Sequence, residues 1–333
     1  KFNKNIYFLF FSIFLLSFLN FEWITQKIIY HDQIRMFIDE KVSCRSDVQH
    51  YFLKNIGRHI TANFDCMQFF FIDGTYAYHK LIFIRILTIL FCSFGILNII
   101  LFFKSLDTLK DATIETFVLL IVTLTIIPGF NYWILSANLI SSISFFLISL
   151  VIRMENNKEY FAQIILFICL FIYQSLVFFY FIKILKIKKF KDIFKFIITF
   201  SITILIYFIS WKFIFTVHEQ PGIYNLNYDL ILIVEKIFFS ASNGFSFMSG
   251  LYIFDFPKLY ILNIVCIIFY SLNSSFLKTS KNLFIVLLIL ITSSTAYFIT
   301  PIEYYISRVM LGSNIFMSYI YIACFVKLRK FIK

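Results

Sequence analysis

The residues best suited to chemistry lie in a polar stretch near the start of the chain, between about Gln26 and Lys80. Asp32 and Arg35 have the i, i+3 spacing that places a carboxylate and a guanidinium on one face of a helix. A positioned carboxylate can act as general base toward a hydroxyl group, and a guanidinium can hold an anionic leaving group. The pair therefore indicates group transfer from an anionic carrier to a hydroxyl acceptor, although an ordinary surface Asp–Arg pair is the simpler interpretation.

Other polar residues could complete such a site. Asp73, at the far end of the same stretch, is the rival base. Arg58 and Arg308 are further candidates for holding an anion, since arginine can grip a phosphate with two parallel hydrogen bonds. The plainer alternatives are a solvated loop arginine for Arg58 and a side chain that snorkels to the membrane surface for Arg308.

The composition indicates a membrane protein. Of the 333 residues, 60% are hydrophobic and 14% are charged, and the mean hydropathy is +0.85. The net charge of +12 comes from lysine and arginine in short loops such as Lys183–Lys195, as the positive-inside rule predicts for cytoplasmic loops. Nucleic acid is therefore not an expected partner. The sequence has no glycine-rich nucleotide-binding motif and no cysteine–histidine pattern of a zinc site.

The apolar runs predict an all-α polytopic membrane protein of about eight to ten transmembrane helices. We expect one membrane domain over residues 1–333. The first run, Asn5 to Phe21, follows Lys1 and Lys4, which places the N-terminus in the cytoplasm and residues 25–80 outside. We expect this large first extracytoplasmic loop to contain short amphipathic helices and the active site.

Two long apolar runs are expected to be broken. Thr116 to Ile152 is long enough for two spans, with a turn at Pro128–Trp133 whose aromatic residues suit the membrane interface. Tyr160 to Ile182 has the length of one span, but one span would place the basic cluster Lys183–Lys195 outside. We therefore prefer a broken or re-entrant pair of short helices with its apex near Tyr173-Gln174. A plain single span is the alternative.

Two smaller expectations concern the first loop and its end. Cys44 and Cys66 both lie in this loop, where a disulfide could form if the loop is extracytoplasmic. The remaining four cysteines lie in apolar runs and are expected to be packing residues. Arg85 is expected at the outer edge of the second span, Ile86 to Phe103.

The order of several short motifs resembles a known family, the integral-membrane glucosyltransferases that modify O-antigen, of the serotype-converting type with a GT-C-like architecture. The motifs cover most of the chain, and each is short. They are Asp32-x-x-Arg35 after the first span, Gly57-Arg58, His79-x5-Arg85 before the second span, the aromatic segment Pro128–Trp133, the step Tyr173-Gln174 in an apolar run, and Ser307-Arg308 before the last span. The family commonly has two adjacent acids where this chain has His31-Asp32.

The resemblance implies transfer of a sugar, glucose in that family, from a polyprenyl-phosphate donor to a surface polysaccharide or lipid-linked glycan. The partners would be this donor, a polysaccharide or glycolipid acceptor and the lipid bilayer. The protein would lie in a bacterial inner membrane with its active site facing the periplasm or the outside. No cofactor is certain, and a divalent cation stays open. The implied site has Asp32 as the catalytic base, Arg35, Arg58 and Arg308 as ligands of the donor phosphate, and His31, His59, Tyr132, Trp133, Tyr173 and Gln174 as substrate ligands.

Two other functions remain open. A lipid-linked oligosaccharide flippase or another transporter would favour charged residues inside its spans, whereas nearly all charge here is expected in loops. A polysaccharide polymerase would place its main loop late in the chain, whereas the main loop here is early.

Overall fold

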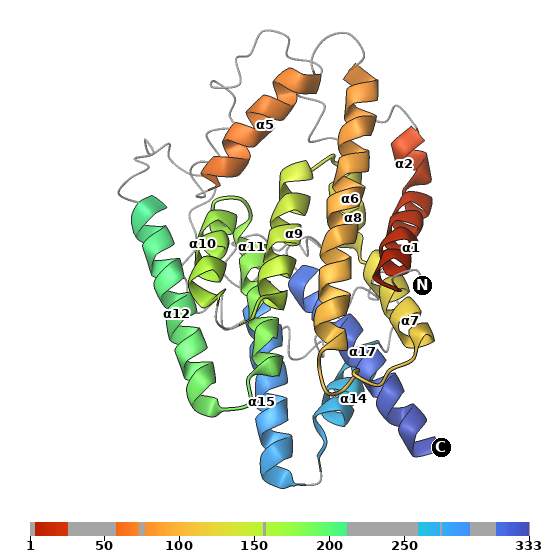
Figure 1. The fold of residues 1–333 in the computed structure, drawn as a ribbon, viewed down its shortest axis with the longest axis vertical. Coiled ribbons are helices and arrows are strands. Elements are labelled where there is room, and N and C mark those ends of the chain that lie inside the picture. The colour runs from red at the N-terminus through yellow and green to blue at the C-terminus, as the bar shows by residue number, and fades with distance from the viewer. Residues whose placement is uncertain are drawn as a thin grey trace.

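The structure is a computed structural model that describes residues 4–25, 58–72, 77–155, 158–211, 259–273, 275–293 and 311–332. Within these ranges every regular element is helical (Figure 1). The elements are α1 (Lys4–Leu19), α2 (Phe21–Thr25), α5 (His59–Ile72), α6 (Ala77–Lys104), α7 (Ile114–Thr125), α8 (Pro128–Leu135), α9 (Leu139–Arg153), α10 (Glu159–Leu170), α11 (Gln174–Val177), the 3₁₀ helix η3 (Phe178–Lys186), α12 (Phe190–Ile209), α14 (Leu259–Ser271), α15 (Phe276–Ser293) and α17 (Leu311–Ile332).

Four described helices are long and apolar enough to cross a membrane. They are Tyr78–Lys104 within α6, Phe190–Ile209, Phe276–Ser293, and Leu311–Lys330 within α17. The pair α7 and α8, which is bent by 54°, would make a fifth if it forms one span. The prediction of an all-α integral membrane protein is confirmed at this level. The residues between α12 and α14, and between α15 and α17, lie outside the described ranges.

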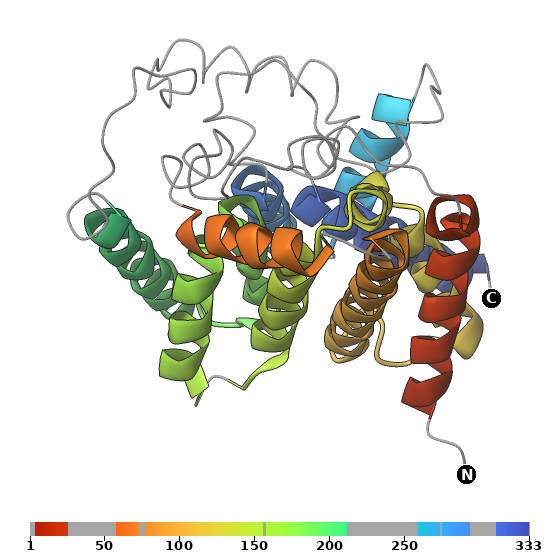
Figure 2. The ribbon, with the colours of Figure 1, turned by 90° about the horizontal axis from the view of Figure 1, so that it is seen from above.

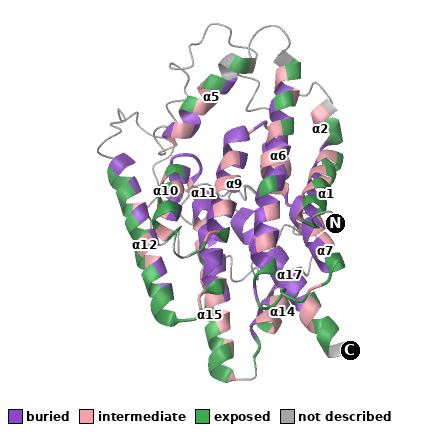
Figure 3. Cartoon of the chain, in the orientation of Figure 1, coloured by how far each residue is buried: buried purple, intermediate pink, exposed green. Residues whose placement is uncertain are grey.

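The centre of the bundle is the pair α6 and α9, which pack at very short range. A Cβ atom added to Gly95 of α6 would overlap the ring of Phe145 on α9. Glycine is needed where two helices approach this closely. In the 18-residue apolar window of each candidate span, 61% of the residues are buried in α6 and 72% in α17, whereas only 28% are buried in α12. The buried surface accordingly follows the central helices, and α12 lies at the periphery (Figure 3).

The run from Thr116 to Ile152 is broken, but not in the way that the sequence predicts. Pro128 to Leu135 is helix α8, so Pro128 begins a helix instead of ending one. Proline fits the first helical position because its missing N–H would be unpaired there anyway. Trp133 is fully buried inside the protein. The turns lie on either side of α8, at residues 126–127 and 136–138.

Arg85 lies in the third turn of α6, which begins at Ala77, and its side chain is fully buried. Its position at the outer edge of the span stays a prediction. Its Nη2 donates to the carbonyl of Leu135 at 3.2 Å. Leu135 is the last residue of α8, where carbonyl groups lack helical partners and the helix dipole favours a cation. The α8–α9 turn is held further by Gln68, whose Nε2 donates to the Ala137 carbonyl at 3.0 Å.

Residues 159–186 form a helical hairpin, as the conflict with the charge rule predicts. Helix α10 ends at Leu170, residues 171–173 turn, and α11 and η3 lead back beside α10. The two ends of the hairpin meet in an ion pair, since Lys183 Nζ lies 3.5 Å from Glu159 Oε2. Tyr180 also donates to Glu159, at 3.1 Å. The predicted break in the helix near Tyr173-Gln174 is therefore confirmed, and the re-entrant course of the pair in the membrane stays a prediction.

Helix α5, in the region predicted as the first loop, crosses one end of this bundle. It lies obliquely over the ends of α9 and α10 in Figure 1, and the view from above shows it running across the other helices (Figure 2). Its first residues therefore come close to the apex of the hairpin. The lower ends of α6 and α9 lie away from α5 and above the lowest turns of α12 and α15 (Figure 1).

Candidate functional site

The start of α5 is bonded to the turn of the hairpin. The N–H of Ile60 donates to the carbonyl of Phe171 at 3.2 Å, and the hydroxyl of Thr61 donates to the carbonyl of Ile172 at 2.7 Å. The His59 ring lies against the Phe171 ring, with 6.1 Å between centroids. These bonds use carbonyl groups that the end of α10 leaves without helical partners. They hold the residue before α5, Arg58, over the apex.

Arg58 makes two contacts with the predicted Tyr-Gln step. Its Nε donates to Oε1 of Gln174 at 2.7 Å. Its Cζ lies 4.4 Å from the centroid of the Tyr173 ring, a cation–π distance. Both contacts fix the plane of the guanidinium, whose Nη groups form the edge that binds phosphates and carboxylates in pairs of hydrogen bonds. Arg58 and Gln174 are half-buried, so this edge lies at the boundary of the helix bundle.

The amide of Gln174 joins the hairpin to α12. Its Nε2 donates to the hydroxyl oxygen of Tyr207 at 2.8 Å. The Tyr207 ring packs edge-on against Phe171, 4.9 Å between centroids, and stacks with Trp211 at 6.1 Å. Three segments far apart in the sequence therefore meet at one hydrogen-bonded group: the start of α5, the hairpin turn and the end of α12.

The inner wall of this cluster comes from α8. The Trp133 ring meets the Tyr173 ring edge-on, with 6.0 Å between centroids. Its Nε1 is buried without a hydrogen-bond partner among the described residues, as is the hydroxyl of Ser175 next to Gln174. Buried polar atoms of this kind are usually hydrogen-bonded, and the described residues hold ten such atoms without a partner, spread over several helices. Tyr132, the neighbour of Trp133, is half-buried.

Helix α5 also carries a disulfide. Cys66 is disulfide-bonded, whereas Cys92, Cys169, Cys266 and Cys324 are free. Cys44 lies outside the described residues. Disulfides persist in oxidising compartments.

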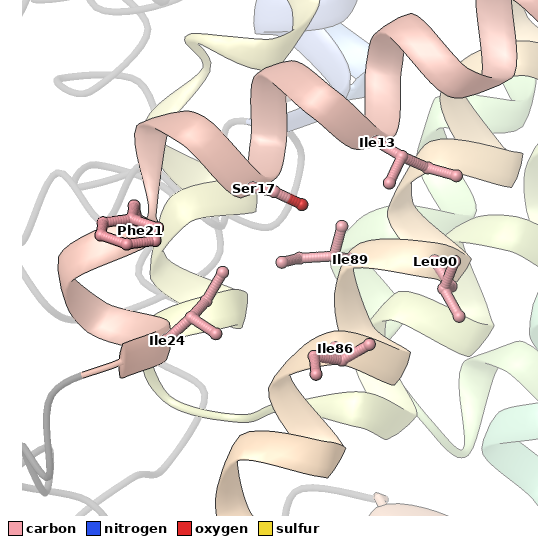
Figure 4. Close-up of a pocket in the computed structure, with 7 residues that line it drawn as sticks. All are labelled: Ile13, Ser17, Phe21, Ile24, Ile86, Ile89 and Leu90. Atoms are coloured by element: carbon pink, nitrogen blue, oxygen red, sulfur yellow. The ribbon is translucent and has the colours of Figure 1, made fainter.

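An apolar groove lies between the first helices and α6. Side chains of α1 and α2 face those of α6 across it (Figure 4), and its volume is about 350 Å³. Ser17 is the one polar residue of its lining, so the groove suits a hydrocarbon chain. The lining residues are Ile13, Ser17, Phe21, Ile24, Ile86, Ile89 and Leu90.

The structure therefore brings together five of the predicted site residues. Arg58, Tyr173 and Gln174 are in direct contact, Trp133 packs on Tyr173, and His59 lies beside the turn. Tyr132 is adjacent in sequence, but no described contact joins it to Arg58 or Gln174. The predicted base Asp32, its rival Asp73, and His31, Arg35 and Arg308 lie outside the described residues. Among the residues that are described, no group of three or more His, Cys, Asp or Glu side chains could hold a metal ion.

Sequence reasoning missed Tyr207 and Thr61. Tyr207 and Trp211 stand four residues apart near the end of an apolar run, which is the usual place of interfacial aromatic residues. That signal locates the end of a span but gives no information about the partner. Thr61 bonds a backbone carbonyl, and the sequence carries no sign of such a contact.

The chain matches no protein-family model, no curated protein and no solved structure.

Proposed function

We propose that this chain is a membrane glycosyltransferase. It transfers a sugar, glucose by the family resemblance, from a polyprenyl-phosphate donor to a surface polysaccharide or lipid-linked glycan on the extracytoplasmic face. The observation that carries the proposal is the placement of Arg58 on Tyr173 and Gln174. These motifs, which the resemblance assigned to one site, are 116 residues apart in sequence and in contact in space.

The chemistry of this cluster suits a phosphate leaving group. A guanidinium held in a fixed plane can accept the charge that develops on the donor phosphate as the sugar leaves, at no cost of reorganisation during the reaction. The apolar groove lies between α1, α2 and α6, across the bundle from the hairpin (Figure 1), and suits a hydrocarbon chain.

The proposal includes a topology. The protein has about eight to ten transmembrane helices in a bacterial inner membrane, and residues 25–80 form the large first extracytoplasmic loop. The disulfide at Cys66 supports this side for α5. Asp32 is the general base toward the acceptor hydroxyl, and Arg35 and Arg308 share the donor phosphate with Arg58. No cofactor is required by this scheme, and a divalent cation stays open.

The test is consumption of a radiolabelled polyprenyl-phosphate sugar by membranes that contain the protein. Asp32→Asn should lower turnover by roughly 10²–10⁴-fold, the usual effect of losing a positioned acid–base group. Asp47→Asn is the matched control, because Asp47 lies in the same stretch among basic residues. If Asp32→Asn keeps full turnover while Asp73→Asn abolishes it, the base is Asp73. If neither acid matters in membranes that transfer sugar, the site is not in this loop.

A second function, translocation of a lipid-linked oligosaccharide, has one observation in its favour. Arg85 is fully buried inside α6, and a buried cation within a span is typical of a transport pathway. Proteoliposomes separate the two functions. A flippase moves the lipid-linked glycan between leaflets and leaves it chemically intact, whereas the transferase releases free polyprenyl phosphate.

A further inference from the structure

A second cationic cluster lies at the end of the hairpin far from Arg58. The 3₁₀ helix η3 builds it, because side chains three residues apart eclipse each other in such a helix. Tyr180, Lys183 and Lys186 therefore form one column along η3. The first two are buried and bond Glu159, whereas Lys186 is exposed at the end of the column. The ion pair with Glu159 thus balances Lys183 and leaves the charge of Lys186 uncompensated.

Arg153 reaches the same place from α9. Its Nη1 donates to Oδ1 of Asn98 on α6 at 2.9 Å. The Lys186 ammonium lies 4.8 Å from the centroid of the Phe102 ring, also on α6. Asn98 and Phe102 are one helical turn apart and share a face of α6. Arg153 and Lys186 therefore contact the same face of α6 at positions one helical turn apart.

The charges of this cluster do not cancel. Lys183 and Arg153 lie close enough to Lys186 for their positive charges to repel it. In the described part of the chain, Glu159 forms an ion pair with Lys183, and no carboxylate forms one with Arg153 or Lys186. Both residues also end a helix, where the dipole favours a cation. Exposed Lys188, Lys189 and Lys191 add further positive charge.

We propose that Arg153 and Lys186 form a binding site for a phosphate group. Arg153 supplies a planar fork and Lys186 a mobile point charge, which together suit one phosphate anion. The phosphate can come from the headgroup of an anionic phospholipid or from a soluble phosphate compound. The site is separate from the proposed transferase site and does not depend on it.

The experiment measures ligand adducts of the detergent-solubilised protein by native mass spectrometry. The probes are short-chain phosphatidylglycerol, short-chain phosphatidylcholine and inorganic phosphate. We expect phosphatidylglycerol to bind and each of Arg153→Gln and Lys186→Gln to weaken it about fivefold, the contribution of one basic residue at an anionic lipid surface. Lys186→Arg should keep the affinity. Lys191→Gln, which removes the same charge from a neighbouring exposed position, should change it by less than about twofold.

The probes distinguish the two possible sources of the phosphate group, a phospholipid headgroup and a soluble phosphate compound. Competition by inorganic phosphate at the concentration of the lipid assigns the site to a soluble phosphate, and its failure assigns the site to a headgroup. Equal binding of phosphatidylcholine and phosphatidylglycerol would overturn the proposal, as would equal weakening by Lys191→Gln. Each variant is first checked for an unchanged thermal midpoint, so that a loss of binding is not a loss of folding.

Discussion

Arg58 and Gln174 are 116 residues apart in sequence, yet Arg58 Nε donates to Gln174 Oε1 at 2.7 Å. The bond joins the segment before α5 to the apex of the hairpin. Because the donor is charged and the acceptor is a neutral amide, the contact orients the guanidinium without neutralising it. A site that must bind an anion needs this kind of partner, since a carboxylate in place of Gln174 would cancel the charge.

Arg58→Lys should lower sugar transfer by about tenfold to a hundredfold. Lysine keeps the charge but loses the Nε–H bond to Gln174 and the planar contact with Tyr173, and a hydrogen bond to a charged group is worth about 1.5–3 kcal/mol. The measurement is initial rate with a polyprenyl-phosphate sugar. Arg329→Lys, at an exposed position of α17, is the matched control and should not change the rate. Full activity of the Arg58→Lys variant would remove Arg58 from the site.

Tyr207→Phe should destabilise the protein by about 1 kcal/mol, because it leaves the Gln174 amide without the acceptor that the hydroxyl oxygen provides. The ring stays in place against Phe171. Thermal unfolding in detergent measures the effect. If the bond is as described, Gln174→Leu and Tyr207→Phe will be non-additive in a double-mutant cycle. Additive effects of the two changes would contradict it.

Glu159→Gln should be among the more damaging single changes outside the candidate site. Lys183 is only 3% exposed, so loss of its carboxylate leaves a buried charge without a counterion. Breaking such a pair typically costs about 3–5 kcal/mol. We expect the lower part of that range, because the Glu159 side chain keeps 27% of its surface exposed. The double variant Glu159→Gln, Lys183→Met should recover part of the loss. If it is less stable than Glu159→Gln alone, the ion pair is not the cause.

Lys188→Cys tests which side of the membrane the hairpin returns to. In a cysteine-free background, a membrane-impermeant maleimide added to intact cells should not label this position, because the positive-inside rule predicts both ends of the hairpin on the cytoplasmic side. The same reagent should label the introduced cysteine once the membrane is permeabilised. A second variant, Lys80→Cys, should react from outside. Labelling of Lys188→Cys in intact cells would mean that residues 159–186 cross the membrane.

Some features of the fold and of the candidate site are predictable from the sequence on physical grounds. The hairpin at Tyr173 is predictable because Lys183–Lys195 carries a charge pattern that a single span would place on the wrong side. Contact between Arg58 and Gln174 follows from an ordered set of motifs, and composition alone does not indicate it. The all-α membrane fold follows from composition and the length of the apolar runs.

Other features depend on contacts that leave no trace in the sequence. Helix α8 was mistaken for a turn because Pro128 and Gly129 are common in turns, although proline is equally suited to the first helical position. Burial of Arg85 depends on the carbonyl of Leu135, and any residue type provides a carbonyl. The partner of Tyr207 is set by how α12 packs on the hairpin. The role of Asp32 stays a prediction, since it lies outside the described residues.

Two tryptophan side chains allow ligand binding at the candidate site to be followed by intrinsic fluorescence. The chain has three tryptophans, and two of them touch its aromatic residues: Trp133 meets Tyr173, and Trp211 stacks on Tyr207. Indole emission shifts in wavelength and intensity with the polarity and charge around the ring. With Trp23 replaced by phenylalanine, the native fluorescence of the protein would come from these two positions. Binding of a donor at Arg58 would then change the tryptophan emission, so that binding could be measured without a label and before the transfer reaction.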